Sequence, residues 1–87
     1  MAWTIELSRP VAKSLEKLGA PAARRIAKGL REIAELENPR LRGIPMVGNH
    51  AGHWRYRFGD HRVIARIEGQ RLIIIVLAIA HRREVYD

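Results

Sequence analysis

The 87-residue sequence contains no cysteine. This absence excludes disulfide bonds, thiolate zinc sites and a thiol nucleophile. Long hydrophobic runs are absent too: the longest, residues 72–80, falls far short of the roughly 20 residues that a membrane helix needs. The residues after Met1 lack the basic and apolar segments of a secretory signal. We therefore expect a cytoplasmic protein with no membrane partner.

Acidic residues are scarce as well. The chain has 9 Asp and Glu residues against 16 Lys and Arg residues, so its formal net charge is +7. A hydrophobic content of 47% is that of a globular protein, and this length allows one core, so we expect a single domain over residues 1–87. The charge favours an anionic partner, nucleic acid or an acidic protein, over a merely solvated basic surface.

The hydrophobic pattern predicts an α+β fold in the order β-α-α-β-β-β. A short strand over residues 3–7 is followed by two amphipathic helices, which Gly19 separates and Asn38-Pro39 ends. Residues 40–52 are rich in glycine and proline and are expected to be loop. The next three strands are expected at residues 53–58, 61–68 and 71–80, the last of them central because it is almost entirely apolar. The fold class is thus an antiparallel four-stranded sheet with a helical hairpin packed on one face.

One segment, residues 53–63, carries the strongest pattern. It alternates basic and aromatic residues with period two and then turns at Gly59-Asp60. Since successive side chains of a strand point to opposite faces, the aromatic residues share one face and the basic residues the other. The aromatic set, expected to pack beneath the helices, is Trp54, Tyr56 and Phe58, and the basic set is His53, Arg55 and Arg57.

A two-residue turn at Gly59-Asp60 fixes the register of the following strand. It places Arg57 directly opposite Arg62, and like charges in that relation destabilise a hairpin. Such an arrangement is rare unless an anion binds beside it. The same register, continued through a second two-residue turn at Gly69-Gln70, places His81 on this face of the sheet.

We therefore expect a phosphate-binding cluster at this end of the sheet, because guanidinium groups present a planar fork of donors to phosphate oxygens. The alternative is that the arginines pair with acids or point to solvent. The nearby acids, Asp60, Glu68 and Glu84, are too few to pair with all of them. The expected members are Arg55, Arg57, Arg62 and His81, joined by Arg82, Arg83 and Tyr86 from the C-terminal residues.

Other catalytic constellations do not emerge from the sequence. No Ser-His-Asp set, glycine-rich phosphate loop or pair of carboxylates can be assembled. His50 and His53 flank a glycine-rich loop but lack a third metal ligand, so surface positions are expected for both. The sequence therefore predicts no metal ion and no cofactor.

With these residues in place, the chain resembles the RelE/ParE superfamily of bacterial toxins over nearly its full length, and the RelE branch in particular. The strongest segments are residues 54–63 and residues 81–86. The weaker segments are Ser8-Arg9-Pro10, Lys17-Leu18 and Leu41-Arg42-Gly43.

The resemblance implies a toxin of a type II toxin–antitoxin system with a microbial-ribonuclease-like sheet. It implies an endoribonuclease, an mRNA interferase that cleaves mRNA in the ribosomal A site of the 70S ribosome by metal-free attack of the RNA 2′-oxygen on phosphorus. It also implies neutralisation by a cognate acidic antitoxin, with operator DNA bound only through the toxin–antitoxin complex.

Motif by motif, the resemblance assigns Arg62 and Arg82 to stabilising the phosphate. It assigns Arg55 and Arg57 to holding the RNA backbone, and Tyr86 to stacking on or orienting a base. Lysines are common in the family at the two strand positions, and arginine is a poor general base at neutral pH. Because an imidazole ionises near neutral pH, His81 is the candidate acid or base.

Two other functions remain open at this stage. A ParE-like toxin would inhibit DNA gyrase by binding, without a catalytic constellation. A decayed module would only bind an antitoxin or operator DNA. The paired strand arginines and the residues Arg82 and Tyr86 favour the nuclease.

Overall fold

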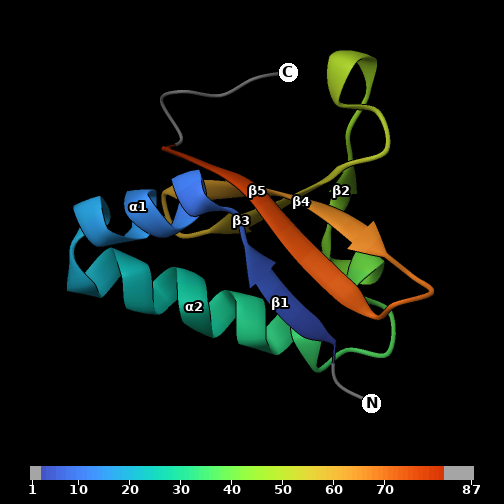
Figure 1. Ribbon diagram of the computed structural model, residues 1–87, viewed down its shortest axis with the longest axis horizontal. Coiled ribbons are helices and arrows are strands. Elements are labelled where there is room, and N and C mark those ends of the chain that lie inside the picture. The colour runs from blue at the N-terminus through green and yellow to red at the C-terminus, as the bar shows by residue number, and fades with distance from the viewer. Residues whose placement is uncertain (1–2, 82–87) are drawn as a thin grey trace.

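The computed structural model describes residues 3–81 and has an α+β architecture, with two helices packed on a five-stranded mixed sheet (Figure 1). The strand order in the sheet is β1-β5-β4-β3-β2. Along the chain the elements are β1 (Thr4–Leu7), α1 (Arg9–Leu18), α2 (Ala20–Ala34), the 3-10 turn η1 (Pro39–Arg42), β2 (Ile44–Pro45), the 3-10 turn η2 (Gly48–His50), β3 (Trp54–Phe58), β4 (His61–Glu68) and β5 (Ile73–His81).

The central position predicted for the last strand is confirmed. β5 lies between β1 and β4, and its residues Ile74 and Val76 are fully buried. β1 runs parallel to β5, while the pairs from β2 to β5 are antiparallel. The fold class is therefore confirmed, with two corrections: the sheet has a fifth strand, β2, and one of its pairings is parallel.

The two helices form the expected hairpin against one face of the sheet (Figure 1). α1 begins where the Ser8 hydroxyl accepts a hydrogen bond from the Val11 backbone N–H at 3.4 Å, with proline in its first turn. The apolar stripe of α2 is buried in the core. α2 ends at Ala34, earlier than predicted, where the Ala34 carbonyl accepts a 2.8 Å hydrogen bond from the Trp3 backbone N–H.

Close contact between α2 and β3 depends on Gly29. This residue is buried in the middle of α2, and a Cβ atom there would overlap the ring of Phe58. The Phe58 and Tyr56 rings stack with a centroid separation of 6.2 Å. The prediction that the aromatic residues of this strand pack beneath the helices is therefore confirmed, with Tyr56 the most buried of them.

The segment expected to be loop is more ordered than predicted, because η1, β2 and η2 all lie within it. Its anchor is Tyr56, whose hydroxyl donates a 2.9 Å hydrogen bond to the buried carbonyl of Pro39. Gly43 packs directly against the same ring, and a Cβ atom there would lie 2.9 Å from Tyr56 Cζ. Tyr56 thus fixes the segment that carries β2 to the edge of β3.

Replacing Tyr56 with Phe should flatten the alkaline loss of stability. Burial raises the pKa of the Tyr56 phenol from 10.0 to about 12, although nearby Arg40 lowers it. Because the folded state keeps a proton that the unfolded chain loses, the free energy of unfolding should fall by about 2–3 kcal/mol between pH 10 and 12. Urea unfolding across this range measures the slope, and parallel curves for wild type and Tyr56→Phe would contradict it. At pH 7 the variant should be about 1–2 kcal/mol less stable, because the Pro39 carbonyl loses its donor.

Candidate phosphate-binding site

The β3–β4 hairpin has the register that the sequence predicts. Phe58 pairs with His61, Arg57 with Arg62, and Arg55 with Ile64. Directly opposed residues of an antiparallel pair project from the same face of the sheet. Arg57 and Arg62 are therefore brought together across the turn, as expected.

The arginines lie on the face of the sheet turned away from the helices. Tyr56 and Val63, which alternate with them along the two strands, are buried in the core. Arg55 and Arg62 are half-buried and Arg57 is exposed. The Arg57 Nε donates a long, 3.4 Å hydrogen bond to the carbonyl of Gly59, so this guanidinium is only lightly held by the hairpin.

A hollow of about 160 Å³ opens at the edge of β3, where the short strand β2 ends. Three arginines line it: Arg55, Arg57 and Arg42. None of its described lining residues is acidic, and its remaining walls are apolar or aromatic. A cavity of this size with three cationic donors suits a phosphate group.

Sequence reasoning missed Arg42 as a site residue. Arg42 stands in the Leu41-Arg42-Gly43 segment and is the last residue of the 3-10 turn η1, just before β2. The signal that could have found it is Gly43, whose close packing on Tyr56 holds this segment against β3. The position of Arg42 thus follows from tertiary packing, which a local sequence pattern does not reveal.

The predicted position of His81 is wrong. The turn between β4 and β5 contains four residues, since Glu68 pairs with Ile73. The pairing then shifts between Ile64 and Ala65, which leaves Leu77 of β5 without a partner. Such a β-bulge sends all later side chains of the strand to the opposite face.

As a result Ala80, and not His81, lies opposite Arg62. His81 pairs with His61, and the two imidazole rings meet edge to face with a centroid separation of 5.3 Å. Both rings line a hollow of about 320 Å³ beneath α1, on the helix side of the sheet. The arginine face and the histidine pair are therefore separated by the sheet.

The other predicted site residues, Arg82, Arg83 and Tyr86, lie outside the described residues. Arg66 of β4 forms an ion pair: its Nε lies 2.7 Å from Glu68 Oε2. This contact lowers the pKa of the Glu68 carboxyl, first through the hydrogen bond from Arg66. Arg66 is thus distinct from the arginines that line the hollow.

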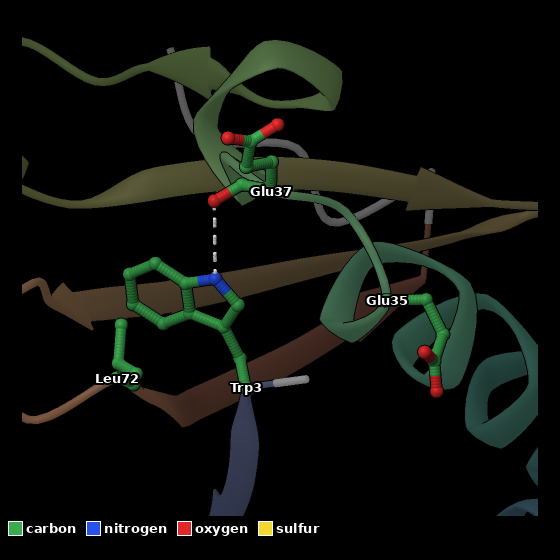
Figure 2. A pocket seen from close by; sticks show the side chains of 4 residues that line it. All are labelled: Trp3, Glu35, Glu37 and Leu72. Carbon is green, nitrogen blue, oxygen red and sulfur yellow. Dashed lines mark hydrogen bonds between the residues drawn. The ribbon is translucent and has the colours of Figure 1, made fainter. Parts of the chain in front are cut away.

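A larger hollow, of about 570 Å³, has the wrong charge for phosphate. It is lined by Trp3, Leu72, Glu35 and Glu37, near the beginning of β1 and β5. Figure 2 shows the indole N–H of Trp3 directed at the Glu37 carbonyl, which accepts its hydrogen bond at 3.4 Å. Two glutamates at its walls repel an anion, and the arginine pair lies near the other end of β5.

Over residues 3–81 there is no group of three or more histidine, aspartate or glutamate residues placed to hold a metal ion. Within the same residues, no helix has the length and apolar character of a membrane span.

The sequence matches the family described as the ParE toxin of the type II toxin–antitoxin system parDE, over residues 5–86. The chain belongs to this family. It is thus a toxin of the RelE/ParE superfamily, as the sequence motifs indicate. No curated protein matches the sequence.

Solved structures share the fold. The RelBE2 toxin–antitoxin complex from Mycobacterium tuberculosis gives a TM-score of 0.84 at 20% identity, covering 97% of this chain and 95% of that one. The archaeal RelE–RelB complex from Pyrococcus horikoshii gives 0.75 at 22% identity, covering 98% and 100%. The intact RelBE complex of E. coli gives 0.70 at 20% identity, covering 92% and 96%. At these identities the likeness establishes the architecture of the toxin chain.

Replacing Arg57 with Thr should stabilise the protein while weakening its phosphate site. The change removes one of two like charges that face each other across the hairpin, so we expect a gain of about 0.5 kcal/mol in the free energy of unfolding. Pyrophosphate should raise the thermal midpoint of the wild type more than that of the variant. Differential scanning calorimetry measures both effects.

Arg66→Thr is the matched control, because Arg66 is an arginine of the neighbouring strand β4 that pairs with Glu68. Its response to pyrophosphate should equal that of the wild type. A loss of stability in Arg57→Thr, or an undiminished response to pyrophosphate, would contradict the assignment.

Proposed function

We propose that this type II toxin is a metal-free endoribonuclease that cleaves mRNA in the ribosomal A site. The observation that carries the proposal is the Arg57–Arg62 pair, which the hairpin forces together on an open face beside a hollow lined by Arg42 and Arg55. Binding a gyrase subunit requires no such concentration of charge, whereas binding a phosphodiester does. Since ribosomes are the site of action, the proposal places the toxin in the cytoplasm.

In the proposed reaction the RNA 2′-oxygen attacks the adjacent phosphorus, and the bond to the 5′-oxygen breaks. The products are a 2′,3′-cyclic phosphate and a free 5′-hydroxyl. Negative charge builds on the phosphorane oxygens, so fixed guanidinium groups beside them stabilise the transition state more than the ground state. Arg62 and Arg82 are assigned this role, while Arg55, Arg57 and Arg83 hold the flanking backbone and Tyr86 stacks on a base.

The structure removes the support for His81 as acid or base. Its ring lies under α1 with His61, on the side of the sheet opposite Arg62. The described residues of the arginine face would neutralise charge and position the RNA. Because arginine stays protonated at neutral pH, these residues would not accept the transferred proton. We therefore propose that cleavage does not depend on the His81 imidazole.

A ParE-like activity is the second candidate. The matching family is described by its ParE member, and resemblance to that branch implies a toxin that inhibits DNA gyrase by binding. In that case the arginine face would be a docking surface for an acidic patch of the target. The two functions differ in whether RNA is cut.

We further propose that the cognate antitoxin, a small acidic protein, binds along the outer edge of β1. β1 ends the sheet, so its free edge offers backbone groups to an added strand. Beside it lies an apolar hollow of about 170 Å³ between β1 and the helices, walled by Leu7, Leu15 and Leu30 with Arg31 at its margin. Leu7 is 44% exposed and lines this groove, so a partner that covers the groove would bury its side chain. Operator DNA would then be bound through this complex.

Replacing Leu7 with Glu should weaken antitoxin binding by at least about tenfold, because it places a carboxylate in the apolar groove against an acidic partner. Val47→Glu is the control, since Val47 is 76% exposed near the opposite edge of the sheet. Affinities from titration calorimetry with the antitoxin measure the effect. Equal losses of affinity in both variants would indicate that the antitoxin binds another surface.

The nuclease is tested by expressing the toxin and mapping the 5′ ends of cellular transcripts. We expect cleavage in phase with codons that Arg62→Ala and Tyr86→Phe reduce by about 100-fold or more, while Arg66→Ala and His81→Ala leave it unchanged. Intact transcripts together with DNA double-strand breaks would establish gyrase poisoning in its place. Loss of cleavage in His81→Ala, with the fold retained, would contradict this proposal and show that the imidazole takes part in cleavage.

A further inference from the structure

Arg25 of α2 reaches the tip of the β3–β4 hairpin. A Cβ atom at Gly59 would lie 2.7 Å from Arg25 Cδ and 3.0 Å from one of its guanidinium nitrogens. Arg25 lies one helical turn before Gly29, the residue that packs on Phe58, so one face of α2 contacts both the end of β3 and the turn. Gly59 permits this close approach because it has no side chain and adopts a φ of 64°.

Two arginines therefore meet at Gly59 from opposite sides of the sheet. Arg57 reaches it from the open face, where its Nε donates to the Gly59 carbonyl, and Arg25 reaches it from the helix side. Over residues 3–81 the exposed side chain of Arg25 has neither an ion pair nor a hydrogen bond, so the nearby carboxylate of Asp60 is not its partner. Packing on Gly59 thus places a guanidinium whose donors are available to an anion.

A merely structural role would not require this charge. The aliphatic carbons of Arg25 suffice to pack α2 on the turn, whereas the guanidinium brings a second positive charge to a residue that Arg57 already contacts. The positive charge also continues from the turn onto the helices. α1 has three basic residues and one acidic residue, and α2 has four and one. A continuous run of cationic groups from an open sheet face onto a helix suits the backbone of a nucleic acid.

We infer that Arg25 binds a phosphate of the RNA backbone beside the arginine face, so that the RNA strand crosses the Gly59-Asp60 turn toward α2. This inference rests on the proposed function and extends its binding site beyond the phosphate that is cut. Because a phosphate contact carries no sequence information, Arg25 adds affinity equally for RNA of any sequence.

The test is fluorescence anisotropy with a short single-stranded RNA that is 2′-O-methylated, so that its 2′-oxygens cannot attack phosphorus. For single strands, the slope of log affinity against log salt concentration is about 0.7 for each neutralised phosphate. We expect Arg25→Gln, which keeps the carbons that pack on Gly59, to bind about five- to tenfold more weakly at low salt and to lower this slope by about 0.7. Arg25→Lys should restore the slope, since an ammonium group also binds phosphate.

Arg24→Gln is the matched control. Arg24 is also exposed on α2 and its loss changes the net charge equally, but helical geometry turns it about 100° away from Arg25. Its slope should equal that of the wild type. Equal changes of slope in Arg24→Gln and Arg25→Gln would show a general effect of net charge and would overturn the contact.

Arg57→Thr separates this inference from the proposed function. If Arg57→Thr weakens RNA binding while Arg25→Gln keeps the wild-type affinity and slope, the strand does not cross the turn, and only the inference fails. If the wild type does not bind the RNA, or if neither variant changes its affinity, the arginine face is not an RNA site, and the proposed function fails with the inference.

Discussion

The buried ring of Tyr56 is the contact on which the candidate site depends. Its hydroxyl bonds to the Pro39 carbonyl, and Gly43 packs against its face, so one side chain ties η1 and β2 to β3. Strand geometry then determines the face from which the neighbouring arginines project. With Tyr56 directed into the core, its neighbours Arg55 and Arg57 must project from the opposite face, and Arg42 is held at the rim of the same hollow.

The hairpin holds an arrangement that folding alone does not favour. Arg57 and Arg62 oppose each other across the strands, and like charges directly opposite in a sheet are destabilising. The core side of the same two strands supplies the compensation, because Tyr56 and Val63 are almost completely buried. Burial on one face thus holds the two arginines opposite each other on the other face.

The sequence was sufficient for the parts of the site that depend on local rules. Period-two alternation and a two-residue turn at Gly59-Asp60 fix the β3–β4 register, and the apolar run of β5 fixes its central place. β2 escaped prediction because two residues, one of them proline, carry no strand pattern, and their pairing with Trp54 and Arg55 depends on packing around Tyr56. Arg42 was missed for the same reason.

The misplacement of His81 has a different origin, and it changes the chemistry that the fold can perform. The bulge at Leu77 lies within an uninterrupted apolar run, and no glycine or proline marks its position. The sequence therefore predicts a regular register for the whole strand. Because Leu77 is left out of the pairing, the His81 side chain projects from the helix side of the sheet. The guanidinium groups therefore remain on the open face, and the two histidines lie beneath α1. A nuclease of the proposed kind would accelerate the reaction by holding the phosphodiester and neutralising charge, and the transferred proton would go to a group that the described part of the arginine face does not provide.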